Sequence, residues 1–193
     1  QIGLLSLPVF VAALGYFVDV YDLLLFTIVR QTSVMSIGST AETIIVDSAH
    51  IINWQMSGLL IGGILWGVLG DKKGRLKVLF GSILLYSVAN ILTSFVQNVD
   101  QYAYCRFIGG IGLAGELGAG ITLVSEMLPK NKRGIGTSMV AGIGLFGAVF
   151  AYFTFKYTDD WRLCYQIGGV LGFLLLILRV KVAESLMFVY FYI

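Results

Sequence analysis

The sequence predicts an all-α integral membrane protein built from six transmembrane helices. Hydrophobic residues make up 58% of the 193 residues, and 24 glycines come in addition. Soluble domains are about 45–50% apolar with glycine already counted. Charged residues make up only 12%, too few to cover the surface of a soluble globule of this size. Long apolar runs separated by short polar clusters occur six times, and each can cross a hydrocarbon core of about 30 Å.

The six predicted spans follow one another with short connections. They are Leu4–Val29, His50–Leu69, Leu76–Val96, Tyr102–Met127, Ile135–Phe155 and Trp161–Leu178. The first span is too long for a signal peptide, lacks a basic leader and contains two aspartates. The second, fourth and fifth spans are rich in glycine, which allows the close backbone approach that holds helices together in lipid. Alternating strands of about ten residues, typical of a membrane barrel, do not occur in the sequence.

Lysine and arginine are concentrated on one side of the predicted membrane. Nine of the thirteen basic residues lie in the loop between spans two and three, the loop between spans four and five, and the C-terminal stretch. They are Lys72, Lys73, Arg75, Lys77, Lys130, Lys132, Arg133, Arg179 and Lys181. Because cytoplasmic loops carry the excess of basic residues, we expect both termini to be cytoplasmic, in a plasma or bacterial inner membrane.

Five ionisable residues fall inside predicted spans, where each costs about 2.5–3.5 kcal/mol and is therefore a functional candidate. They are Asp19, Asp22, Arg106, Glu116 and Glu126. Asp19 and Asp22 share one helix face, where two carboxylates at low dielectric favour the binding of a proton. The alternative is that both only face a water-filled cavity. Asp22 and Arg106 lie at a similar depth of about 8–12 Å, so they can meet if spans one and four are neighbours.

A second group of charges lies at the cytoplasmic ends of the spans. Glu126 ends the fourth span, where the helix dipole disfavours an anion, so it requires nearby cations. The predicted cluster consists of Asp71, Arg75, Glu126 and Arg133. It fits a structural clamp as well as a cytoplasmic gate.

The remaining polar residues indicate binding rather than catalysis. Tyr21, Gln55 and Glu116 are candidate substrate contacts, although aromatic and amide side chains in spans often serve in packing. A single histidine and the lack of a metal-ligand cluster predict neither an enzyme nor a metal or cofactor site. The net charge of +2 without a basic run predicts no nucleic-acid partner. Cys105 and Cys164 both lie near the outer face, as a disulfide or as two small hydrophobic residues.

Several motifs together resemble the major facilitator superfamily. The segments GVLGDKKGRLK (67–77), RFIGGIG (106–112), EMLPKNKRG (126–134) and AES (183–185) are similar to its loop between helices two and three, its fourth helix, its loop between helices four and five and its motif after helix six. The elements DVYDL (19–23) and AGELG (114–118) resemble the metabolite–proton symporter branch, and other motifs are shared with sugar porters.

The resemblance implies half of a major facilitator fold. Residues 1–193 would form one six-helix domain of two three-helix inverted repeats, about 1–97 and 98–193. The implied function is proton-coupled symport of a small polar metabolite, an organic acid or a sugar, by alternating access. Asp22 and Arg106 would form the proton-coupling pair. Asp19 and Glu116 would tune that pair or touch the substrate.

The alternative is a six-helix half-module that functions only after pairing with a second half. A transporter of this superfamily needs two such halves. A parallel homodimer has the right symmetry to supply the second one. Gln1 and the apolar tail 186–193 instead favour a truncated chain whose C-terminal half is missing. The substrate, the direction of transport and the choice between H⁺ and Na⁺ stay open at this point.

Overall fold

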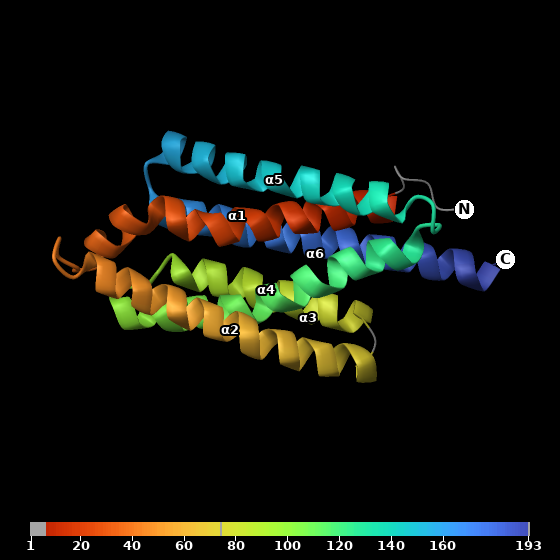
Figure 1. The fold of residues 1–193 in the computed structure, drawn as a ribbon, viewed down its shortest axis with the longest axis horizontal. Coiled ribbons are helices and arrows are strands. Elements are labelled where there is room, and N and C mark those ends of the chain that lie inside the picture. The colour runs from red at the N-terminus through yellow and green to blue at the C-terminus, as the bar shows by residue number, and fades with distance from the viewer. Residues whose placement is uncertain (1–6, 74, 193) are drawn as a thin grey trace.

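The computed structural model in Figure 1 describes the backbone of residues 7–73 and 75–192 and the side chains of residues 9–73, 77–116 and 128–181. Six α-helices and no strand occur within these backbone ranges. The helices are α1 (Leu7–Ser36), α2 (Ile44–Lys73), α3 (Arg75–Thr93), α4 (Val99–Met127), α5 (Arg133–Thr158) and α6 (Trp161–Tyr192). They run side by side as an elongated bundle (Figure 1). The predicted all-α fold is therefore confirmed.

The helices extend beyond several predicted spans. α1 continues past Val29 to Ser36, and α2 begins at Ile44 rather than at His50. Hydropathy marks only the part of a helix inside the hydrocarbon core, whereas the helix itself continues until the backbone turns. After α1 this turn occurs at Gly38, whose φ of 108° is readily adopted by glycine and rarely by other residues.

Local hydrogen bonds define the ends of three helices. The Asn98 side chain accepts the Gln101 N–H at 2.9 Å as α4 begins. The Asp160 side chain accepts the Arg162 N–H at 2.8 Å and caps α6 in the same way. α5 ends at Thr158, and the next residue, Asp159, adopts a left-handed conformation with φ 49° and donates its N–H to the Phe155 carbonyl.

Four described stretches are long and apolar enough to cross a membrane by length and composition. They are Val9–Ser36, Ile44–Lys73, Arg133–Thr158 and Trp161–Lys181. Lys77–Thr93 in α3 is apolar but shorter. The described side chains of α4 include three charged residues, Asp100, Arg106 and Glu116. Hydropathy and length therefore identify fewer spans than the bundle has helices.

α1 and α4 lie at the centre of the packing. α1 contacts α5 and α6, α4 contacts α2 and α3, and the two central helices contact each other. Glycines permit the close approach of α2 and α4: a Cβ atom at Gly110 would lie 2.5 Å from the Gln55 carbonyl oxygen. On the other side of the bundle, Gly147 of α5 lies against the backbone of Phe17 in α1. The glycine-mediated packing expected in lipid is thus present at both contacts.

The connections alternate between the two ends of the bundle. The start of α1, the end of α6 and the α2–α3 and α4–α5 connections lie at one end (Figure 1). The α1–α2, α3–α4 and α5–α6 connections lie at the opposite end, which we call the outer end after the predicted orientation. The buried charges of the described side chains lie mainly on α1 and α4, the two central helices.

Candidate functional site

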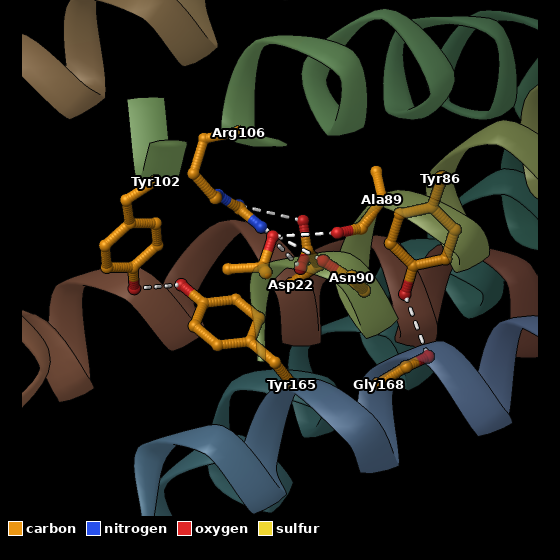
Figure 2. Close-up of polar contacts among 9 residues, drawn as sticks. Asp22, Tyr86, Ala89, Asn90, Tyr102, Arg106, Tyr165 and Gly168 are labelled. Atoms are coloured by element: carbon orange, nitrogen blue, oxygen red, sulfur yellow. Dashed lines mark hydrogen bonds and ion pairs between the residues drawn. The ribbon is translucent and has the colours of Figure 1, made fainter. Parts of the chain in front are cut away.

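A buried ion pair between Asp22 of α1 and Arg106 of α4 forms the centre of the candidate site (Figure 2). Nη1 of Arg106 donates to Oδ1 of Asp22 at 3.1 Å, and Nη2 donates to Oδ2 at 3.0 Å. Both side chains are only 1% exposed. A bidentate guanidinium–carboxylate pair is among the strongest polar contacts, and burial makes each partner necessary to the other. The two residues that the sequence places at a similar depth therefore lie in direct contact.

Asn90 of α3 completes the polar surroundings of Arg106. Its Oδ1 accepts a hydrogen bond from Nη1 of Arg106 at 3.1 Å (Figure 2). Among the described residues, Nε of Arg106 and Nδ2 of Asn90 are buried donors without an acceptor. Buried polar atoms are normally hydrogen-bonded, so two unpartnered donors beside an ion pair are unusual. An acceptor on a bound molecule would satisfy these two donors.

Aromatic residues separate the ion pair from the outer end. The guanidinium carbon of Arg106 lies 5.3 Å from the ring centroid of Tyr165 in α6. The hydroxyl of Tyr102 donates to that of Tyr165 at 2.8 Å (Figure 2). Tyr102 also stacks on Trp161 with centroids 5.6 Å apart. Arg106 therefore has a cation–π contact with Tyr165, and the three aromatic rings form an apolar layer between Arg106 and the outer end.

A second buried ion pair joins α4 to α6. Nη1 of Arg179 donates to Oε2 of Glu116 at 2.8 Å, and Nη2 contacts Oε1. The side chains of Arg179 and Glu116 are 8% and 5% exposed. Both lie against Gly15 of α1, where an added Cβ would overlap them. Among the described side chains, the bundle therefore contains two buried carboxylate–guanidinium pairs.

The assignment of Arg179 to a basic stretch beyond the last span was wrong. α6 does not end at Leu178 but continues through Arg179 into the C-terminal residues. Two sequence signals could have revealed this position. Neither glycine nor proline follows Gly172, so nothing ends the helix, and a buried Glu116 requires a cation.

Asp19 lies on α1 between the two ion pairs. Gly15, Asp19 and Asp22 are spaced four and three residues apart, so they occupy one face of the helix. Asp19 is 2% exposed, and the charges of Glu116, Arg179 and Asp22 all act on it. No cation of the described side chains lies within ion-pairing distance of Asp19. Among the described buried carboxylates, Asp19 is therefore the one without an ion-pair partner.

The other two candidate substrate contacts lie elsewhere in the packing. Tyr21 is buried, and its hydroxyl donates to the Cys164 carbonyl of α6 at 2.8 Å. Gln55 is buried at the contact between α2 and α4. No hydrogen bond between described residues connects either side chain to Asp22 or Arg106. Their assignment to substrate binding stays a prediction.

The predicted cytoplasmic cluster is only partly covered by the described residues. Asp71 is exposed near the end of α2. Arg133 is exposed at the start of α5, and its Nε donates to the Leu128 carbonyl at 3.0 Å. The side chains of Arg75 and Glu126 lie outside the described residues. The cluster therefore stays a prediction, with Arg133 bracing the connection between α4 and α5.

The two cysteines are free thiols, Cys164 buried and Cys105 half-buried. Of the two alternatives left by the sequence, the structure favours small hydrophobic residues over a disulfide. The single histidine, His50, lies at the outer end, with Nε2 at 3.6 Å from Oδ1 of Asp100. The described side chains contain no group of three or more histidine, cysteine, aspartate or glutamate residues that could hold a metal ion.

The chain belongs to the Major Facilitator Superfamily, which it matches over residues 4–187. It is 31% identical over 180 residues to a putative metabolite transport protein of Haemophilus influenzae, covering 92% of this chain and 43% of that protein. It is 30% identical to the niacin transporter NiaP of Acinetobacter baylyi, covering 91% and 40%. It is 32% identical over 142 residues to the 4-hydroxybenzoate transporter PcaK of Pseudomonas putida, covering 72% and 32%.

The fold agrees with solved structures of the same architecture. The xylose transporter XylE from E. coli, in a partially occluded inward open conformation, matches with a TM-score of 0.79 at 20% identity. The match covers 91% of this chain and 49% of that chain. This chain thus spans less than half the length of these curated relatives and about half of the solved transporter. The family and the apolar helices identify an integral membrane protein of a transporter family, as the sequence motifs predict.

Proposed function

We propose that the chain forms one half of a secondary active transporter that couples the movement of a small organic acid to protons by alternating access. NiaP and PcaK are named as transporters of niacin and 4-hydroxybenzoate. Both molecules are small aromatic carboxylic acids. This shared chemistry favours an organic acid over a sugar as the substrate of this chain.

The buried Asp22–Arg106 pair is the observation that carries the proposal. Protonation of Asp22 removes the negative charge that compensates Arg106. Breaking a buried ion pair in this way costs about 3–5 kcal/mol, because one charge is left alone at low dielectric. A substrate carboxylate bound to Arg106 restores the balance. Proton binding and substrate binding therefore favour each other, and one proton moves together with one carboxylate.

The packing of the helices supports inverted repeats at about 1–97 and 98–193. In such repeats α1 corresponds to α4, α2 to α5 and α3 to α6. The contact between α2 and α4 then corresponds to the contact between α5 and α1, and both are present. The contact between α3 and α4 likewise becomes that between α6 and α1. Transporters built from such repeats alternate between inward and outward access by rocking around a central site. Asp22 and Arg106, on the two central helices, are positioned for this role.

A second six-helix half is part of the proposal. The relatives are more than twice as long as the matched region, which leaves room for another six helices. A continuation of the same chain or a second copy in parallel orientation would both face the site from the other side. Native mass spectrometry in detergent distinguishes them: a particle of two identical chains supports the homodimer, and a longer single chain supports the fused arrangement.

The transport proposal is tested with the native protein in proteoliposomes under an imposed pH gradient. Radiolabelled niacin and 4-hydroxybenzoate are the first substrates. We expect Asp22→Asn to abolish accumulation driven by the pH gradient and to retain exchange of labelled for unlabelled substrate. Asp159→Asn is the control, because Asp159 is exposed and asparagine tolerates its left-handed backbone. Normal accumulation by Asp22→Asn, or accumulation driven by sodium alone, would contradict the proposal.

A further inference from the structure

We propose that Asp19, Glu116 and Arg179 form a second proton-binding site, in which two carboxylates share one proton around a single guanidinium. We call these three residues the Arg179 site. The role of this site in coupling rests on the proposed transport function, but its occupancy by a proton does not. The proposal follows from the charges, contacts and burial of the residues in the bundle.

The buried charges of the described side chains do not balance. Three carboxylates and two guanidiniums are buried: Asp19, Asp22, Glu116, Arg106 and Arg179. Each arginine is hydrogen-bonded to a carboxylate of its own, Arg106 to Asp22 and Arg179 to Glu116. One carboxylate is therefore left over. An uncompensated buried charge is strongly disfavoured, and a bound proton removes it.

The surplus carboxylate belongs to the Arg179 site rather than to the Asp22–Arg106 pair. Arg106 already makes a bidentate bond to Asp22 and a bond to Asn90, so the Asp22–Arg106 pair is balanced in charge. Asp19 instead lies in the electrostatic field of Glu116 and Arg179. Glu116 and Arg179 also touch α1 at Gly15, one helical turn from Asp19. In this proposal the proton is therefore shared between Asp19 and Glu116.

The groups that face Asp19 come from four helices. They are Asp22 on α1, Tyr86 on α3, Glu116 on α4 and Arg179 on α6. The part of α5 that packs on α1 there presents Gly144, Gly147 and Phe150, which do not titrate. Arg179 is accordingly the one cation among the described groups that face Asp19. Its guanidinium can bond only one of the two carboxylates in bidentate geometry, and the other holds the proton.

The position of the proton determines which helix Arg179 binds. In the structure Arg179 is bonded to Glu116, which corresponds to ionised Glu116 and protonated Asp19. Transfer of the proton to Glu116 would release Arg179 to bond Asp19. This exchange would move the attachment of α6 from α4 to α1. The Arg179 site therefore links proton binding to the packing of three helices.

Infrared spectroscopy of the native protein tests the proposal without transport. A protonated carboxyl absorbs in the carbonyl stretching region, and the band shifts in D₂O. We expect the difference spectrum of wild type against Asp19→Asn at neutral pH to show one lost protonated carboxyl. The same loss is expected for Glu116→Gln, because Asp19 is then the one carboxylate beside Arg179 and can ionise. Asp159→Asn, which removes an exposed carboxylate, should show no loss.

Removal of the Arg179 guanidinium should increase the number of protonated carboxyls. In Arg179→Gln neither carboxylate is compensated, so we expect one additional protonated carboxyl. A residue with a merely structural role would not add this band. A flat difference spectrum for both Asp19→Asn and Glu116→Gln, or no added band in Arg179→Gln, would overturn the proposal. Because three variants are measured, the test does not depend on any one of them folding, which size-exclusion chromatography checks.

The two proposals can fail separately. If Asp22→Asn still concentrates substrate while the three bands change as expected, the proposed coupling is wrong and the Arg179 site stands. If Asp22→Asn uncouples transport while the bands do not change, the Arg179 site is wrong and the transport proposal stands.

Discussion

Gly15 of α1 lies so close to Arg179 of α6 that any side chain at this position would overlap the guanidinium. The same hypothetical Cβ would overlap the carboxylate of Glu116. The buried pair between α4 and α6 is thus accommodated by a missing side chain on α1. This close approach also brings the pair within one helical turn of Asp19.

We expect Gly15→Ala to lower the stability of the native protein by about 1–3 kcal/mol, because the methyl group displaces the ion pair or separates the helices. Gly142→Ala on α5 is the matched control, since a Cβ there meets no atom within 4 Å. Thermal unfolding in detergent measures both variants. Equal stability of the two variants would contradict the close approach at Gly15.

Adjacent glycines on α2 provide a second matched pair. A Cβ at Gly62 would lie 2.6 Å from the Ile111 carbonyl oxygen and 2.7 Å from its Cα, whereas a Cβ at Gly63 meets nothing within 4 Å. We expect Gly62→Ala to cost about 1–3 kcal/mol, because backbone atoms of α4 cannot move aside. Gly63→Ala should be neutral or stabilise the helix by up to about 1 kcal/mol. The prediction is wrong if the two variants unfold at the same temperature.

The Asp22–Arg106 pair should show strong coupling in a double-mutant cycle. Arg106→Gln alone leaves a buried carboxylate unpaired, and we expect a loss of about 3–5 kcal/mol in stability. Asp22→Asn combined with Arg106→Gln removes both charges, so the double variant should be more stable than Arg106→Gln. Denaturation of the four proteins gives the coupling energy. Additive losses would show that the two side chains do not depend on each other.

Tyr165 should stabilise Arg106 through its ring rather than through its hydroxyl. Tyr165→Phe keeps the ring, whose centroid lies 5.3 Å from the guanidinium carbon, and loses only the hydrogen bond with Tyr102. We expect a cost of about 0.5–1.5 kcal/mol for that hydrogen bond. Tyr165→Leu also removes the cation–π contact, worth about 2 kcal/mol when desolvated. Thermal unfolding compares the two variants. Equal losses for Tyr165→Phe and Tyr165→Leu would exclude the cation–π contact.

The contact between Asp22 and Arg106 could be anticipated from the sequence to a large extent. The length of each apolar run sets where a helix crosses the hydrocarbon core, so depth follows from residue number. A buried arginine needs an anion, and Asp22 lies at a matching depth. The pair can form only if α1 and α4 are neighbours, and the two helices do contact each other in the bundle. The aromatic and Asn90 contacts around the pair carry no such signal, because neutral side chains do not require a particular partner.

The contact between Glu116 and Arg179 could not be anticipated in the same way. Hydropathy places Arg179 beyond the last span, since a charged residue following an apolar run reads as the membrane boundary. The helix nevertheless continues, because nothing in the following residues breaks it. Whether Glu116 faces α6 or α1 depends on the rotation of α4 about its axis. That rotation is set by glycine contacts with α2 and α3, such as those of Gly110 and Gly112.

The sequence by itself determined the class of protein, the six helices, the family and the residues whose charges had to be compensated. These follow from properties that act along the chain: hydrophobic length, charge and the cost of burying an ion. Only the tertiary structure decided which carboxylate each arginine binds, that the cysteines are free, and that Asp19 is left without a cation of its own among the described residues. Those outcomes depend on helix rotation and neighbour choice, which arise from the close packing of side chains far apart in the sequence.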